Sequence, residues 1–194
     1  MMKKNKQPKN VLAILGSPRP NGLVATMLKH AVQQAEQAGH SVSQINLYEQ
    51  NLNYCTGCQA CYQTQICVQQ DDIQNIVKML RAADIVILAA PVYWGNVPAP
   101  VKNLFDRLLG TAMLPTATFP QPRLAGRQYL LLTACHTPAP WHWLFNQSRG
   151  AFHCMEEFFK TAGMRPLGKV VCPNTEKIHT PSPAVMRRIS KAFC

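Results

Sequence analysis

The sequence predicts an α/β fold, a doubly wound sheet of five parallel strands with helices on both faces. Short apolar runs, of which Val11–Leu15 and Asp84–Ala90 are the clearest, are typical of strands buried on both sides of a parallel sheet. Amphipathic helical patterns alternate with these runs, and such alternation predicts parallel strand order. Nearly half of the 194 residues are apolar and only 15% are charged, which indicates a globular chain. We find neither a repeat nor a linker and expect one domain over residues 10–194.

The first half of the chain supplies two strands and two helices. After the strand Val11–Leu15, apolar residues recur on one face of a predicted helix that ends at Gly39 and His40. Val42–Leu47 alternates as a second strand, and residues 48–70 form a long polar insertion that contains a cysteine cluster. Asp71 and Asp72 then match an N-cap and a first-turn acid. The helix that they begin places four apolar residues inward: Ile73, Ile76, Val77 and Leu80.

The second half continues the alternation. Pro100 suits the first turn of a third helix after the strand Asp84–Ala90. That helix places five apolar residues inward: Val101, Leu104, Phe105, Leu108 and Leu109. Gly110–Gly126 contains prolines and predicts an irregular surface loop. The remaining predicted elements are a strand at Gln128–Thr133, an aromatic-rich helix at Trp141–Ala162 closed by Gly163, a strand at Leu167–Cys172 and a helix at Pro183–Phe193 capped by Ser182.

The net charge of +11 raises the question of a nucleic-acid partner. Four lysines lie in the N-terminal residues 1–9, which we predict to be a basic flexible tail, and the other cations are scattered without interleaved aromatics. The excess also reflects a shortage of acids, and we expect no nucleic-acid partner. No apolar stretch approaches the ~20 residues that span a bilayer, and the apolar run behind the tail is too short for an export signal. We therefore expect a cytoplasmic protein.

Two distinctive loops follow the first and third predicted strands. In a sheet of order 2-1-3-4-5, ligands bind at the carboxyl ends of the strands that flank the change in direction, here the first and third. The first loop, Gly16–Gly22, lies between a strand and a helix, an arrangement that presents backbone N–H groups to a phosphate. Ser17 adds a hydroxyl donor and Arg19 a planar cation suited to phosphate oxygens. We predict an anion site there.

The second loop, Pro91–Asn96, carries adjacent large aromatic residues, Tyr93 and Trp94. One interpretation is a wall on which a flat ring system stacks, with the backbone N–H groups of Gly95 and Asn96 reaching its polar edge. The alternative is that both aromatics pack over the core. The neighbouring anion-type loop favours the first interpretation.

The motifs GSPRPNG and APVYWGNVPAPVKNLFDRL, with this order of elements, resemble the NADPH-dependent FMN reductase branch of the flavodoxin-like flavoproteins. The resemblance extends from Val11 to about Val171 and implies non-covalently bound FMN. It implies that Ser17, Arg19, Asn21 and Gly22 surround the phosphate. It further implies that one loop lines the isoalloxazine (Pro91, Val92, Tyr93, Trp94, Gly95 and Asn96) and that Thr133–His136, including Thr133, Cys135 and His136, closes over its far side. Members often carry Asn-Thr or Ser-Thr where this chain has Leu23 and Val24, so two polar side chains are missing from the expected phosphate cradle.

Four cysteines lie within thirteen residues: Cys55, Cys58, Cys61 and Cys67. Four thiolates at such short spacing can hold one [4Fe–4S] cluster. Zinc also accepts four thiolates, usually as two more widely separated pairs, and free thiols with a redox-active pair remain a third interpretation. The spacing resembles that of the iron–sulfur flavoproteins, a subgroup of the same family.

We consider three functions. The first is an FMN-dependent oxidoreductase that passes electrons from NAD(P)H to a small-molecule acceptor such as a quinone or a nitro- or azo-aromatic compound. The second is an electron-transfer iron–sulfur flavoprotein with a ferredoxin-like partner, whose acidic surface the positive charge would attract. The third is a basic zinc-knuckle-like binding module without flavin, which the α/β pattern disfavours. The resemblance to flavoproteins also implies a homodimer or homotetramer.

Overall fold

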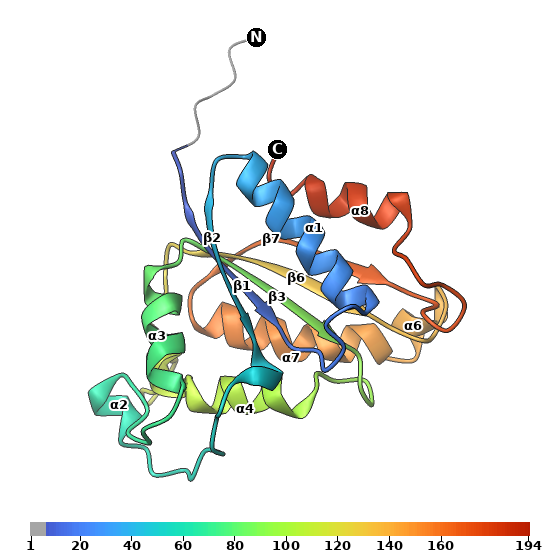
Figure 1. Ribbon diagram of the computed structural model, residues 1–194. Helices are drawn as coiled ribbons and strands as arrows, with labels where there is room; N and C mark the ends of the chain where they lie inside the picture. Colours follow the sequence, from blue (N-terminus) through green and yellow to red (C-terminus); the bar gives the residue numbers. More distant parts are fainter. Residues whose placement is uncertain (1–6) are drawn as a thin grey trace.

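A parallel sheet of five strands, in the order β2-β1-β3-β6-β7, forms the centre of the computed structural model, which describes residues 7–194 (Figure 1). The strands are β1 (Asn10–Leu15), β2 (Ser41–Asn46), β3 (Ile85–Pro91), β6 (Gln128–Ala134) and β7 (Arg165–Cys172). Successive side chains of a strand point to opposite faces, so Val11 and Ala13 join one hydrophobic core while Leu12 and Ile14 join the other. The parallel α/β architecture predicted from the sequence is confirmed.

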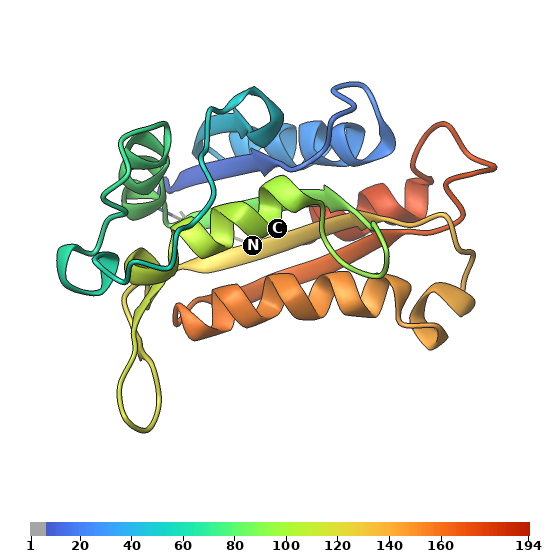
Figure 2. The same cartoon turned by 90° about the horizontal axis from the view of Figure 1, so that it is seen from below.

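Helices cover both faces of the sheet (Figures 1 and 2). The core on one face receives α1 (Leu23–Gln37) and α8 (Pro183–Ser190). The core on the other face receives α3 (Ile73–Ala82), α4 (Ala99–Arg107) and α7 (Gln147–Thr161). The shorter elements are η1 (Leu47–Glu49), α2 (Cys61–Thr64), α5 (Leu109–Ala112), α6 (Trp141–Leu144) and the antiparallel strands β4 (Met113–Leu114) and β5 (Gln121–Pro122).

The predicted helix starts are confirmed at α4 and α8. Pro100 lies in the first turn of α4, and the Ser182 hydroxyl accepts a hydrogen bond from the Val185 N–H at 3.4 Å. Asp72 holds the N-cap position of α3, but its side chain makes no capping bond. Its carboxylate accepts from the Asn51 N–H at 2.6 Å instead, and the carboxylate of Asp71 accepts from the Ile73 N–H.

The predicted helix at Trp141–Ala162 is wrong in one respect, because it is two helices. Asn146 has φ +59°, in the left-handed region, and such a residue cannot continue a right-handed helix, so α6 ends before it and α7 begins after it. The predicted irregular loop Gly110–Gly126 contains most of α5 and the β4–β5 hairpin. The last helix, α8, ends at Ser190 rather than at Phe193.

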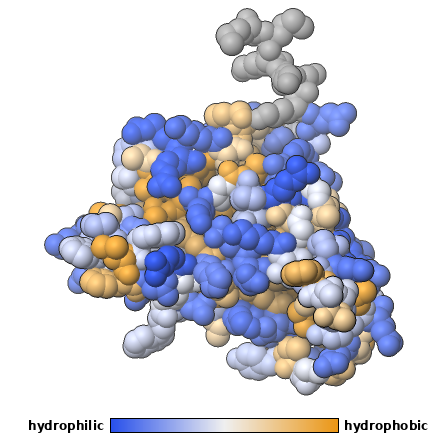
Figure 3. Space-filling model, turned by 180° about the vertical axis from the view of Figure 1, so that it is seen from behind, coloured by the Kyte–Doolittle hydropathy of each residue, from blue (hydrophilic) through white to orange (hydrophobic). Residues whose placement is uncertain are grey.

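The basic tail predicted for residues 1–9 lies mostly outside the described residues. Lys9, at its end, already belongs to the folded part: its carbonyl accepts from the Ser41 N–H, and its ammonium donates to Gln128 at 2.8 Å. No helix in the described part of the chain is long and apolar enough to cross a membrane. Seen from behind, hydrophobic residues reach the surface in several separate areas between hydrophilic ones (Figure 3).

Candidate functional site

A cavity of about 440 Å³ opens at the carboxyl ends of β1, β3 and β6. Its size lies within the range typical of cofactor and ligand pockets. The loops after β1 and β3 both contribute to it, as the change in strand direction between them predicts. The lining residues are Ser17, Arg19, Asn21, Gly22, Leu23, Val24, Pro91, Val92, Tyr93, Ala134, His136, Thr175, Ile178 and His179.

The β1–α1 loop is built by a close approach of backbones. The Gly16 N–H donates to the Ala89 carbonyl of β3 at 2.8 Å, and a Cβ at Gly16 would lie 2.3 Å from Val101 Cγ2, so only glycine fits there. Ser17 is buried, and its hydroxyl accepts from the Arg19 N–H at 3.2 Å. No side chain caps α1, which begins at Leu23. The positive end of the helix dipole therefore faces the loop, as an anion site requires.

The β3–α4 loop turns tightly at Trp94 and Gly95. Tyr93 and Asn96 exchange two backbone hydrogen bonds of 2.8 and 2.9 Å, and both residues between them have positive φ, +53° and +68°. This turn directs the Trp94 side chain into solvent, where it is fully exposed. Gly95 lies against α7, since its carbonyl oxygen would be only 2.1 Å from a Cβ at Gly150.

The cavity brings together eight of the residues that the sequence predicts around a cofactor: Ser17, Arg19, Asn21, Gly22, Pro91, Val92, Tyr93 and His136. Five others lie outside its lining: Trp94, Gly95, Asn96, Thr133 and Cys135. Thr133 is fully buried and donates to the Ala90 carbonyl at 2.7 Å, and the buried Cys135 donates its N–H to the Cys172 carbonyl. Both side chains are therefore buried at or next to the end of β6, outside the cavity lining.

The loop after β7 also reaches the cavity, and this segment is not among the site residues predicted from the sequence. Thr175, Ile178 and His179 contribute to its lining. The carboxyl-end rule applies to every strand of a parallel sheet, and it could have identified this segment after Leu167–Cys172. Leu23 and Val24 line the cavity as well, so apolar side chains occupy the place of the two polar ones.

A second, smaller cavity of about 140 Å³ lies at the other end of α4, beside α2. All four clustered cysteines line it: Cys55, Cys58, Cys61 and Cys67. Burial raises the pKa of the Cys61 thiol, a hydrogen bond with the Gly110 backbone lowers it, and the other three cysteines raise it further.

The cysteine cavity has the number and kind of donors that an iron–sulfur cluster takes, since such clusters are held by four thiolates. Among the described residues, no three histidine, cysteine or acidic side chains already stand in a metal-ligating arrangement. Cys55 and Cys58 are exposed on the loop, whereas Cys67 is buried. The kind and number of donors therefore suit a cluster, although the four sulfurs do not stand in a metal-ligating arrangement in the described part of the chain.

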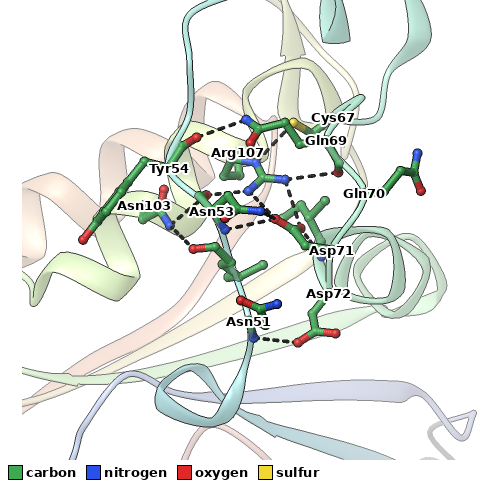
Figure 4. Close-up of polar contacts among 12 residues, drawn as sticks. Asn51, Asn53, Tyr54, Cys67, Gln69, Gln70, Asp71, Asp72, Asn103 and Arg107 are labelled. Atoms are coloured by element: carbon green, nitrogen blue, oxygen red, sulfur yellow. Dashed lines mark hydrogen bonds and ion pairs between the residues drawn. The ribbon is translucent and has the colours of Figure 1, made fainter.

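A buried ion pair holds this segment in place (Figure 4). Arg107, the last residue of α4, pairs with Asp71 at 2.8 Å, and both side chains are at most 1% exposed. Burial by itself raises the pKa of the Asp71 carboxyl, but hydrogen bonds from Arg107, Ile73 and Asn53 outweigh it and hold that pKa below its usual value. Arg107 is not predicted from the sequence, because nothing in a helical pattern distinguishes a buried cation from a solvated one.

Further contacts hold the helical turn α2. Arg123 donates to the Tyr62 carbonyl at 3.0 Å, and the Thr111 hydroxyl donates to the Gln65 carbonyl at 2.7 Å. Gly110 allows α5 to approach, since a Cβ there would lie 2.1 Å from the Cys61 carbonyl oxygen. The cysteine segment is therefore anchored by cationic and hydroxyl donors at several points.

Comparison with known proteins agrees with this architecture. A family model described as NADPH-dependent FMN reductase matches residues 9–155. An iron–sulfur flavoprotein of Archaeoglobus fulgidus is 40% identical over 105 residues, which cover 54% of this chain and 48% of that protein. One of Methanosarcina thermophila is 37% identical over 97 residues, covering 50% and 51%. The chain thus spans about half the length of the curated relatives it matches.

Solved structures share the fold at low identity. An azoreductase from Bacillus anthracis has a TM-score of 0.74 at 16% identity, covering 95% of this chain and 98% of that one. An NAD(P)H:quinone oxidoreductase from Methanothermobacter marburgensis has a TM-score of 0.69 at 15% identity, with coverages of 95% and 91%. An FMN-dependent NADH-azoreductase from Bacillus anthracis, solved in complex with FMN, has a TM-score of 0.71 at 14% identity, with coverages of 95% and 97%.

Proposed function

The chain belongs to the NADPH-dependent FMN reductase family, and from this membership we propose that it is an FMN-dependent oxidoreductase. It takes electrons from NAD(P)H and passes them to a small acceptor such as a quinone or a nitro- or azo-aromatic compound. The observation that supports this most is the 440 Å³ cavity at the strand ends, which joins an anion-type loop to an aromatic loop. The flavodoxin-like order of the sheet places both loops at one edge.

The residues of the cavity suit FMN. Arg19 and the first N–H groups of α1 favour the phosphate, and the small backbone of Gly22 permits its close approach. Pro91 and Tyr93 supply a flat apolar wall for the ring system. When bound, FMN supplies hydride acceptance and electron transfer, and the protein's part is to bind, orient and shield it. Leu23 and Val24 leave phosphate recognition to backbone groups and to Arg19.

Replacing Arg19 by alanine is expected to weaken FMN binding about tenfold and to leave riboflavin binding unchanged. The arginine is exposed, so its charge-assisted hydrogen bonds are worth no more than about 1.4 kcal/mol, and they act on the phosphate alone. Titration of the apoprotein with either ligand, followed by flavin fluorescence, measures both affinities. Equal losses for the two ligands would place the phosphate elsewhere.

The proposed activity is tested by absorption spectroscopy under anaerobic conditions. Protein loaded with FMN should show two flavin bands that bleach promptly when NADPH or NADH is added, and recover when a quinone follows. A protein that fails to take up FMN at tens of micromolar contradicts the proposal. Bleaching by dithionite but by neither nicotinamide cofactor contradicts its NAD(P)H part and favours a protein electron donor.

A second candidate function rests on the cysteine cavity. We propose that Cys55, Cys58, Cys61 and Cys67 hold a [4Fe–4S] cluster, as the names of the relatives from Archaeoglobus and Methanosarcina suggest for those proteins. The chain then exchanges electrons with a ferredoxin-like partner as well as with a small acceptor. The parallel sheet and the family match favour both functions over a zinc-knuckle-like module.

The proposed flavin cavity and the cysteine cavity do not adjoin within one chain. Helix α4 separates them, with Tyr93 before its start and Arg107 at its end, and its nine residues span about 13 Å. Figures 1 and 2 show α2 and α6 at opposite ends of the molecule. We propose a homodimer or homotetramer, in which the cysteine segment of one copy approaches the flavin cavity of another.

The cluster is tested by iron and sulfide content. After anaerobic reconstitution, the chain should hold about four irons and four sulfides and show a broad brown absorption. Cys58→Ser should lower the iron content, whereas Cys154→Ser, in helix α7 outside the cavity, should not. Stoichiometric zinc without sulfide, or full iron content in Cys58→Ser, would contradict a cluster held by these four cysteines.

A further inference from the structure

Arg107 uses its guanidinium to connect three kinds of partner at the cysteine cavity (Figure 4). Its Nε donates to the Cys67 sulfur at 3.2 Å. Its Nη1 and Nη2 donate to the two carboxylate oxygens of Asp71 at 2.8 and 3.0 Å, a bidentate pair. The same two nitrogens also donate to the carbonyls of Asn53 and Gln69, which flank the first and last cysteines of the cluster.

This arrangement makes Cys67 different from the other three cysteines. Cys67 is 7% exposed, whereas Cys55 and Cys58 face solvent. The Cys61 sulfur has a hydrogen bond with the neutral backbone of Gly110. Within the described residues, no cationic side chain donates to the sulfur of Cys55, Cys58 or Cys61. The buried cation of this cavity is directed at one sulfur.

We propose that Arg107 is the positioning residue of the four-cysteine site: anchored by Asp71, it holds Cys67 as the hydrogen-bonded sulfur and so sets the reduction potential of the bound cluster. This inference rests on the cluster proposed above. A hydrogen bond from a cation stabilises negative charge on a ligating sulfur, and that charge grows when the cluster gains an electron. Arg107 therefore makes reduction easier.

Two matched variants separate this role from simple support of the segment. Arg107→Lys retains a buried positive charge but loses the planar fork that reaches sulfur and carboxylate together. Arg123→Lys weakens another anchor of the same segment, one that bonds to the Tyr62 and Gly110 carbonyls and to no sulfur. Both variants are expected to lower the melting temperature. Only Arg107→Lys is expected to change the potential.

The measurement is a one-electron titration of the reconstituted cluster with dithionite, in which dithionite is oxidised and the cluster is reduced. In Arg107→Lys the equilibrium constant for reduction should fall about tenfold, which corresponds to a potential about 59 mV more negative. The double variant Arg107→Met with Asp71→Asn, which leaves no buried charge, should shift in the same direction. Potentials equal to that of the unaltered chain in both variants, or an equal shift in Arg123→Lys, would overturn the inference.

A second readout needs no cluster. In the metal-free protein, Cys67 should be the slowest of the four cysteines to react with iodoacetamide, as followed by peptide mass spectrometry. Cys67 is protected by its burial, so Arg107→Lys, which releases the contact that holds it, should expose the thiol and speed its labelling at least tenfold. Arg123→Lys should speed the labelling of Cys61 and leave that of Cys67 unchanged. If the unaltered chain takes up no iron and sulfide, the cluster proposal fails, and unchanged labelling of Cys67 in Arg107→Lys then overturns the positioning role separately.

Discussion

Replacing Asp71 by alanine is expected to lower the free energy of unfolding by about 3–5 kcal/mol, a large part of the stability of a domain this size. The substitution leaves the Arg107 guanidinium buried without its counter-charge, because both side chains are at most 1% exposed. It also removes the acceptor for the N–H groups of Ile73 and Asn53. Urea unfolding followed by circular dichroism measures the loss.

Asp106→Ala is the matched control for this loss. Asp106 precedes Arg107 in α4 and pairs with Lys102 one turn earlier, but both side chains are about half exposed. Exposed pairs of this kind contribute about 1 kcal/mol or less, so the control should unfold almost as the unaltered chain does. If Asp71→Ala loses no more unfolding free energy than the control, Arg107 finds solvent or another partner in the variant.

The sheet and its two prominent loops were predictable because their signals are local. Apolar runs such as Val11–Leu15 and Ile85–Ala90 are continuous in sequence. Such runs are typical of strands that are buried on both faces of a parallel sheet. The loops then follow from where each strand ends. The predicted start of α4 at Pro100 is local in the same sense, since proline suits the first turn of a helix.

The ion pair of Arg107 and Asp71 was not predictable in this way. The two residues are 36 positions apart, and Arg107 stands in a helix whose pattern assigns it no special face. Burial of a charge depends on the partner that the fold supplies, and periodicity carries no information about that partner. The position of Trp94 shows the same limit. Its positive φ belongs to the turn from Tyr93 to Asn96, and this turn directs the side chain into solvent, whereas one interpretation of the aromatic loop is that it stacks on a ligand.

The cysteines lie between these two cases. Their spacing predicted a shared site, and all four line one cavity. Their unequal exposure was not predictable from spacing: Cys55 and Cys58 are exposed, whereas Cys67 is buried. The segment is held by tertiary contacts with Arg107 of α4 and Gly110 of α5. Spacing therefore predicted which residues meet, and the tertiary contacts decide how each sulfur behaves.

Replacing Gly150 by alanine is expected to weaken FMN binding at least tenfold and to lower the melting temperature. A Cβ at Gly150 would lie 2.1 Å from the Gly95 carbonyl oxygen, so the Tyr93–Asn96 turn must move away from α7. That turn carries Tyr93 into the cavity, and a displacement of about 1 Å is enough to disrupt a positioned ligand. Alanine favours a helix by about 1 kcal/mol over glycine, which offsets only part of the strain in the folded protein.

His153→Ala is the control for this variant, since His153 is exposed on the same helix and its replacement changes helix composition without touching the turn. Fluorescence titration with FMN and a melting curve should show full affinity and near-normal stability for the control, and reduced affinity with a lower melting temperature for Gly150→Ala. A loss of stability alone would mean that α7 moves while the turn stays. Full FMN affinity in Gly150→Ala would exclude the Tyr93–Asn96 turn from the flavin site and leave the phosphate-side loop as its main contact.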